Sequence, residues 1–395
     1  MKAHAHWWIV LAAILGVVAG AMLSHVIEPG VRVEKVMLAT NTPALRIFPA
    51  TPGPHSVALL AHGCGGSKEM LFRFGEALAA AGFECYSVDQ AGFGESPEPC
   101  SLTNILRNFR ETEQALGAVD VFIGHSMGGG VGDWSVDEAG FRPKLFIGVG
   151  ATGPVGGHGP PVLLLFARCD EFRPLMGNLL KAQTNELVVF SPWCEHITEA
   201  YDPMLVRAAV TAACGAIGKP VPAAPTAWRW RFAGLVLGIA GALGLMLYLP
   251  ELHPRLAQMR RFIVPGVLLL ALVLTLGPWV GVSPQLRRLP AHLVVLGVVW
   301  LALAGLRRLR LPRWSLPVAT GGLTLGCLLV ALALPAAYFF LFAVLMCTFG
   351  ISTLLLVPGT LVGRIATRGG SGRDGDLAMA IFAGYVIGEF MPLFY

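Results

Sequence analysis

Charged side chains are scarce in this 395-residue chain. They make up 13% of the residues, against 55% for hydrophobic ones, whereas a soluble domain is about 25% charged. This scarcity excludes a chain that is soluble along its whole length, and it predicts a large membrane-embedded part. Metal-binding signatures are also missing, because the sequence has neither a C-x-x-C pair nor an H-E-x-x-H motif. We therefore expect no metal and no cofactor.

Long apolar runs account for the missing charge. One run lies at 7–27, and six more follow in the second half, at 232–250, 262–282, 291–305, 316–334, 336–358 and 377–395. Most of them reach the ~20 residues needed to cross a hydrocarbon layer ~30 Å thick. An alternative for the first run is a cleavable signal peptide, since a short basic start precedes an apolar core and the small residues 19–21.

These runs predict the domain organisation. A transmembrane anchor or signal peptide occupies 1–28, and an all-α bundle of about six transmembrane helices occupies 229–395. Residues 29–217 are left as a separate domain. The segment 218–228 is rich in proline and alanine, which indicates a stiff linker between the two halves.

Basic residues orient the chain across the membrane. The loops between the runs hold three arginine clusters, at 255–261, 307–313 and 364–373. If the N-terminus with Lys2 is cytoplasmic, all three clusters lie inside, and the outer loops between spans keep only Arg287 and Arg288. This bias places 29–217 outside the cytoplasm, as for a protein of a bacterial inner membrane. The net charge of +5 then reflects orientation in a bilayer and implies no nucleic-acid partner.

A nucleophile motif lies in the domain at 29–217. The apolar run 119–123 is followed at 124–128 by G-x-S-x-G, which centres on Ser126. A serine on such a strand-to-helix turn has a strained backbone, so its neighbours two positions away must be nearly free of side chains. The helix that follows directs its amides toward an anion that forms at the serine. We interpret Ser126 as a nucleophile.

An acid and a histidine follow Ser126 in the order that this arrangement requires. Asp170 comes after the strand-like run 162–167, and His196 comes after the run 186–190. We expect His196 to take the serine proton, and Asp170 to fix its tautomer and stabilise the imidazolium. Glu171 is the rival acid, because neighbouring side chains on a loop can exchange roles.

A glycine-rich loop supplies the remaining part of such a site. His62 begins a His-Gly pair in the loop 61–67, directly after another strand-like run. This position is typical of a loop that stabilises an oxyanion. It predicts two donors to the oxyanion, the backbone amides of Cys64 and Met127.

These motifs resemble the α/β-hydrolase family, and most closely its lipase, esterase and serine-aminopeptidase branch. The resemblance covers roughly 33–217 and includes the segment 89–96, which is a structural turn in that family. It implies an α/β fold and a reaction through an acyl-enzyme. Family members often carry a helix or lid before the strand at 162–167, but here the connection 151–161 is very short. We therefore expect a minimal, lidless α/β-hydrolase sheet.

The sequence predicts a membrane-anchored serine hydrolase that cleaves a small-molecule or lipidic ester outside the cytoplasm. One alternative is a peptidase or amidase of the same mechanism that acts on envelope material. Another is a catalytically idle hydrolase-like module that binds within a membrane complex. The bilayer is the expected partner in each case.

Two further features carry hypotheses. Cys169 and Cys194 lie on the acid and histidine loops, so a disulfide could join these loops in an oxidising compartment, and Cys64–Cys100 is a weaker second pair. Glu389 is an ionisable residue inside a predicted span, which makes it a functional candidate by default.

Overall fold

The computed structural model describes residues 2–38, 41–154, 159–168, 170, 187–275, 357–367 and 372–390, with the single positions 293, 296, 297, 300 and 301. The chain forms two compact units. One is essentially 27–228, and the other combines 1–26 with most of 229–394. We call them the sheet unit and the helical unit.

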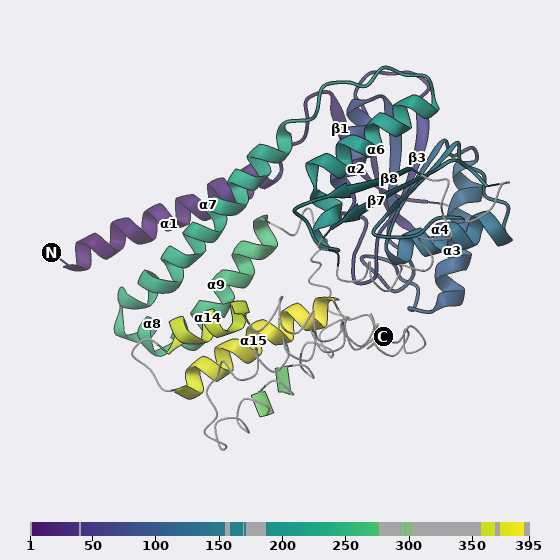
Figure 1. Cartoon of the computed structure of the whole chain (residues 1–395). Helices are drawn as coiled ribbons and strands as arrows, with labels where there is room; N and C mark the ends of the chain where they lie inside the picture. Colours follow the sequence, from purple (N-terminus) through teal and green to yellow (C-terminus); the bar gives the residue numbers. More distant parts are fainter. Residues whose placement is uncertain are drawn as a thin grey trace. The chain divides into compact units, whose positions relative to one another are not determined.

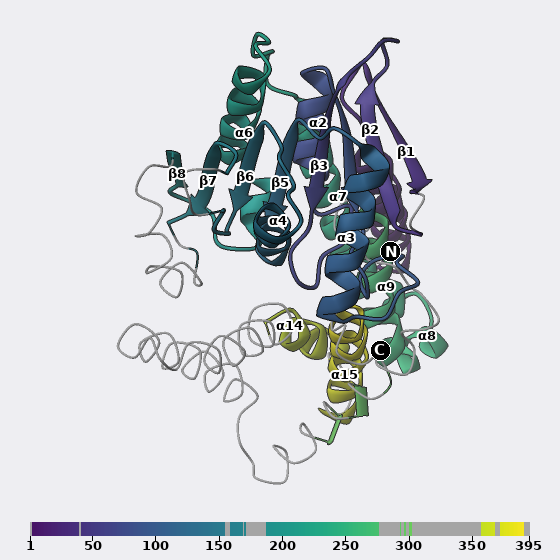
Figure 2. The ribbon, with the colours of Figure 1, turned by 90° about the vertical axis from the view of Figure 1, so that its right-hand side faces the viewer.

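An eight-stranded mixed sheet organises the sheet unit, in the order β1-β2-β4-β3-β5-β6-β7-β8 (Figure 2). The strands are β1 (Val31–Met37), β2 (Pro43–Pro49), β3 (Ser56–Ala61), β4 (Phe83–Val88), β5 (Val121–His125), β6 (Leu145–Val149), β7 (Val162–Ala167) and β8 (Leu187–Ser191). The pairs β1–β2 and β2–β4 are antiparallel, and all later neighbours are parallel. The carboxyl ends of β5, β7 and β8 therefore point to one edge of the sheet.

Helices cover both faces of this sheet (Figures 1 and 2). They are α2 (Phe72–Ala80), α3 (Leu102–Leu116), α4 (Met127–Glu138) and α6 (Pro203–Ala216), with the short 3-10 helix η1 (Thr198–Tyr201) before α6. Residues of α2 and α6 share one apolar cluster with the sheet, and residues of α3 and α4 share the other. Because both faces are buried, the central strands are apolar at successive positions rather than at alternate ones.

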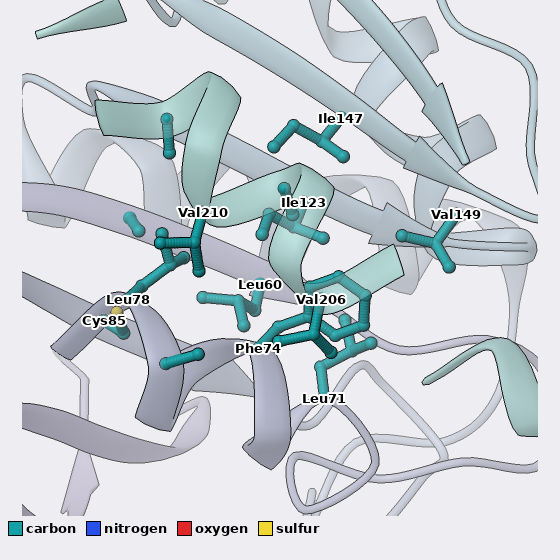
Figure 3. Packing of buried hydrophobic residues seen from close by; sticks show 14 of the residues in the cluster. Leu60, Leu71, Phe74, Leu78, Cys85, Ile123, Ile147, Val149, Val206 and Val210 are labelled. Carbon is teal, nitrogen blue, oxygen red and sulfur yellow. The ribbon is translucent and has the colours of Figure 1, made fainter. Parts of the chain in front are cut away.

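The apolar cluster under α2 and α6 shows how neighbouring strand residues separate. Leu60 of β3 packs with Phe74 of α2 and Val210 of α6 (Figure 3), whereas its neighbour Leu59 belongs to the cluster on the opposite face. All four side chains are buried. Central strands such as β3 are thus fixed from both sides, and the loops at their carboxyl ends begin from a rigid base.

The connection from β6 to β7 is short, as expected. Its described residues, 150–154 and 159–161, contain no helix. Between β7 and β8, the structure describes only residues 168 and 170. The rest of this connection, where a lid over the site would also have room, lies outside the described residues. The lidless site therefore stays a prediction.

The predicted linker is held against the sheet unit by hydrogen bonds. Glu28 accepts two of them through Oε2, from the backbone amides of Thr226 at 2.7 Å and Ala227 at 2.8 Å. Arg207 of α6 donates to the carbonyl oxygen of Pro222 at 2.5 Å. The segment therefore has a defined path before the next helix begins.

The helical unit contains α1 (Lys2–Ser24), α7 (Ala227–Tyr248), η2 (Leu249–Glu251), α8 (Pro254–Gln258), α9 (Arg260–Thr275), α14 (Val357–Ala366) and α15 (Gly372–Phe390) (Figure 1). Glycines bring α1 and α7 into backbone contact. A Cβ added to Gly20 would lie 2.6 Å from the carbonyl oxygen of Gly234 and 2.7 Å from the amide nitrogen of Gly238. Such close approach is typical of helices that pack in a membrane.

Within the described residues, two helices are long and apolar enough to cross a membrane, at His6–Ser24 and Ala227–Glu251. They coincide with the first predicted run and with the predicted span at 232–250. The predicted span at 316–334 lies outside the described residues, as does almost all of 336–358, and only the five single positions fall in 291–305. The six-span bundle therefore stays a prediction.

Two helices of this unit extend beyond the apolar runs that were predicted as spans. The predicted loop after 358 is helical, because α14 continues through Arg364 to Ala366. The last helix begins at Gly372 rather than at 377. Asp374 lies in its first turn, where a carboxylate interacts favourably with the helix dipole, so the charged residues there extend the helix instead of ending it.

Candidate active site

Ser126 stands at the junction of β5 and α4 with φ of 48° and ψ of −115°. A positive φ in a residue other than glycine costs on the order of 1–3 kcal/mol and is found mostly where function requires it. The flanking glycines make this turn possible. A Cβ at Gly128 would overlap the carbonyl oxygen of Ala61, and a Cβ at Gly124 would lie 2.5 Å from the backbone nitrogen of Gly129. The spacing of the motif is thus a steric requirement.

The structure brings Ser126, His196 and Asp170 together at the carboxyl edge of the sheet. Ser126 Oγ lies 2.9 Å from His196 Nε2, and His196 Nδ1 lies 3.1 Å from Asp170 Oδ2. His196 and Asp170 are only 6% and 3% exposed. In the tautomer that suits both contacts, the serine hydroxyl donates to Nε2, and Nδ1–H donates to the carboxylate. The rival acid, Glu171, lies outside the described residues.

His125, directly before the serine, supports the histidine loop. Its Nε2 is 2.8 Å from the backbone carbonyl oxygen of His196, and the two imidazole rings lie 4.9 Å apart. Burial, followed by the nearness of His196, lowers the pKa of His125 to about 3. His125 is therefore neutral at ordinary pH, and its Nε2–H donates to the carbonyl. Sequence reasoning missed this role, although the position of His125 inside the motif could have suggested it.

His62 holds the glycine-rich loop beside the nucleophile. Its Nε2 accepts from the amide of Gln90 at 3.2 Å, which leaves Nδ1–H to donate to the carbonyl oxygen of Gly63 at 2.7 Å. Burial lowers the pKa of His62, so the ring stays neutral and keeps this tautomer. A Cβ at Gly63 would lie 3.2 Å from Ser126 Cβ, so the loop passes directly over the serine.

The two predicted oxyanion donors lie on segments next to the serine. Cys64 is exposed and follows Gly63 in the loop that passes over Ser126. Met127 is the first residue of α4. The first amides of a helix have no acceptor within it, so the Met127 N–H can point toward an external anion.

A buried ion network lies beneath the same loop. Lys68, 1% exposed, places its Nζ 2.7 Å from Asp89, 3.1 Å from Glu95 and 3.3 Å from Glu69. Burial by itself lowers the pKa of Lys68, but the neighbouring carboxylates, Asp89 first, outweigh burial and raise it. Asp89 also accepts from the backbone amide of Lys68 at 2.7 Å. The segment 89–96 thus fixes the loop, and the sequence had given no sign of Lys68.

Three potential metal ligands gather at the site. The side chains of His125, His196 and Glu199 offer ligand atoms that all lie within 4.8 Å of one another. Both ring nitrogens of His196, however, already contact Ser126 and Asp170. A cation bound through His196 would therefore break the contacts that make the serine reactive.

The expected disulfides are not formed. Cys64, Cys100 and Cys194 are free thiols, and Cys169 lies outside the described residues. The thiol of Cys194 is buried and hydrogen-bonds to Ser191 and Asp202, with burial raising its pKa to about 11. Loop proximity along the sequence was therefore a poor guide, because Cys194 turns toward its own strand end.

Comparisons with known proteins agree with the fold. Residues 58–134 match a family model described as the alpha/beta hydrolase fold. The match begins in β3 and ends in α4, so it includes His62 and Ser126 but stops before Asp170 and His196. A comparison with curated proteins found no match. The family match and the eight-stranded sheet with helices on both faces support an α/β hydrolase.

Solved structures resemble about half of this chain at low identity. An epoxide hydrolase from an endophytic Streptomyces is 14% identical, with a TM-score of 0.38 over 48% of this chain and 97% of its own. An esterase/lipase from an uncultured bacterium is 15% identical, with a TM-score of 0.38 over 50% and 88%. The protein TT1662 from Thermus thermophilus is 20% identical, with a TM-score of 0.39 over 48% and 99%. Identities this low transfer no substrate to this chain.

Proposed function

We propose that this protein is a membrane-anchored serine hydrolase that cleaves an ester through an acyl-enzyme, with Ser126, His196 and Asp170 as its catalytic residues. The observation that carries the proposal is the continuous chain of contacts from the serine hydroxyl to the buried carboxylate, at 2.9 Å and 3.1 Å. The strained backbone of Ser126 adds support, because such strain is retained where a function requires it.

The reaction follows from this geometry. Ser126 Oγ attacks the substrate carbonyl carbon while its proton passes to His196 Nε2, and Asp170 stabilises the imidazolium through Nδ1. The negative charge on the carbonyl oxygen is met by the backbone amides of Met127 and Cys64. The imidazolium then gives its proton to the leaving alkoxide. A water molecule, deprotonated by the same histidine, attacks the acyl-enzyme carbonyl. The bond from the acyl carbon to Ser126 Oγ then breaks, the imidazolium returns its proton to Oγ, and the acid is released.

Attachment to a bilayer belongs to the proposal. The segment His6–Ser24 is 19 residues long, so it spans about 28 Å as a helix at 1.5 Å per residue, close to the thickness of a hydrocarbon layer. Trp7 and Trp8 are exposed near one end of this helix, and Trp230 is exposed near the start of α7. Tryptophan is typical of the membrane–water interface. Arginines cluster between the apolar runs, at 255–261, 307–313 and 364–373, and this positive-inside bias supports a sheet unit that faces the side opposite the cytoplasm.

We favour a retained anchor over a cleaved signal peptide. Gly20 lies in the sequence that would be cleaved, and it is also the point at which α1 packs against the backbone of α7. Cleavage after this point would remove α1 and leave the glycine face of α7 without the helix that packs on it. The intact mass of the membrane-extracted protein tests this directly, since a cleaved protein would lack the residues before the cleavage point.

The activity is tested with Ser126→Ala in the full-length protein, purified in detergent. Loss of the triad serine removes on the order of a million-fold in turnover, so the variant has neither ester hydrolysis nor labelling by a fluorophosphonate. Ser56→Ala, at the start of β3, is the matched control and keeps both. Normal hydrolysis by Ser126→Ala would refute the assignment, and a wild-type protein that resists labelling would favour the idle binding module.

The class of substrate needs a second measurement. Parallel panels of acyl esters of increasing chain length and of aminoacyl amides separate an esterase from a peptidase or amidase. Ester turnover that exceeds amide turnover in this panel is the expected result. Preferential cleavage of the amides would replace the esterase proposal with the envelope peptidase.

A further inference from the structure

A second carboxylate lies beside the candidate catalytic histidine. Glu199 belongs to η1, three positions after His196, and its side chain is fully buried. One of its oxygens, Oε1, accepts a short hydrogen bond from the backbone amide of Ala167, the last residue of β7. The side chain is thus held in place by the same strand that leads to Asp170.

The other oxygen of Glu199 points to the space between β6 and the histidine. A Cβ added to Gly150, which follows β6, would overlap Glu199 Oε2 and would also lie 2.9 Å from both Cε1 and Nδ1 of His196. A carboxylate oxygen of Glu199 and a ring nitrogen of His196 lie within 4.8 Å of each other. Because Gly150 has no side chain, the carboxyl group of Glu199 on η1 occupies the space that a side chain at position 150 would otherwise fill.

The groups around His196 determine what this carboxylate can do. Among the described residues, the titratable or charged side chains that face the ring are Asp170 after β7, His125 at the end of β5 and Glu199 on η1. His125 is neutral because it is buried, and its donor serves the His196 carbonyl. Two carboxyl groups therefore lie beside the ring on which positive charge forms, in a site with little solvent, where charge interactions are weakly screened.

We propose that Glu199 is a positioning residue that stabilises the His196 imidazolium together with Asp170 and sustains part of the reaction when Asp170 is absent. This inference rests on the proposed function, since it assumes that His196 takes the serine proton. It differs from a purely structural role, in which Glu199 would merely tie η1 to the end of β7.

The pH dependence of kcat/KM separates these roles. Glu199→Gln keeps an oxygen that can accept from Ala167, but it removes the negative charge. Without that charge the imidazolium is less stable, so the acid limb of the profile moves about one unit toward lower pH, and kcat falls about tenfold with KM unchanged. Glu195→Gln is the matched control, because Glu195 caps the backbone amides of Ile197 and Thr198. We expect Glu195→Gln to leave both the acid limb of the pH profile and kcat unchanged.

A second variant, Asp170→Ala, tests the proposal if Glu199→Gln folds poorly. When the acid of a lone-acid triad is disabled, turnover drops about 10⁴-fold. With Glu199 beside His196, Asp170→Ala loses about 10²-fold, and a loss near 10⁴-fold would overturn the proposal. An acid limb that stays unmoved in folded Glu199→Gln would overturn it as well. Both results leave the serine hydrolase intact, whereas an inactive, unlabelled wild-type protein would refute the proposed function itself.

Discussion

Replacing Lys68 by methionine should destabilise the sheet unit strongly. Methionine has a similar length, so the apolar part of the buried side chain is largely kept while the charge is removed. Asp89, which is fully buried, then loses a cation 2.7 Å away, and Glu69 and Glu95 lose their shared partner. Breaking a buried ion pair on one side costs about 3–5 kcal/mol, because the remaining charge stays desolvated.

The matched control is Lys35→Met. Lys35 pairs with Glu95 at 2.6 Å, but its side chain is 63% exposed, and exposed pairs contribute about 0–1 kcal/mol. Pulse proteolysis of the full-length protein across a urea series measures the free energy of unfolding of both variants. Equal losses in Lys68→Met and Lys35→Met would refute the reasoning that burial makes the difference.

The pH dependence gives an independent check on Lys68. Its pKa is raised above the ordinary 10.5 in the folded protein. Its contribution to stability is therefore fully present below pH 10.5 and is lost as the pH rises through the higher folded value. The gap in unfolding free energy between wild type and Lys68→Met should stay constant from pH 6 to about pH 9 and shrink only at more alkaline pH.

Two further predictions concern packing. Phe122→Ala removes a fully buried ring that packs against three other phenylalanines, so it should cost about 3–5 kcal/mol by urea unfolding, whereas Leu187→Ala, at a position 64% exposed, changes little. Gly20→Ala places a methyl group 2.6 Å from the carbonyl oxygen of Gly234 and should separate α1 from α7 at a cost of about 1–3 kcal/mol. Gly266→Ala meets open space, and an equal melting temperature in detergent for these two glycine variants would contradict the packing argument.

Much of the fold could be predicted from the sequence because local chemistry repeats along it. Runs such as 162–167 are apolar at successive positions, which indicates a strand buried on both faces, and β7 occupies that range. The glycines two positions from Ser126 indicate a sharp turn, since larger residues would overlap the backbone. The order serine, acid, histidine along the chain then indicated that Asp170 and His196 follow later strands. The helical half was harder, because charged residues near 364 and 373 look like loop residues yet lie in helices.

The tertiary structure alone decided which side chains meet. The strand order places the ends of β5, β7 and β8 on one edge, and this order cannot be read from apolar runs that look alike. Lys68 pairs with Asp89, and Glu199 reaches the space at Gly150, through contacts between distant parts of the chain. Sequence patterns report the local environment of a residue, namely its burial and its backbone. A charge is stabilised by whatever partner the folded chain brings within a few ångströms, and that partner is fixed only when the strands have paired.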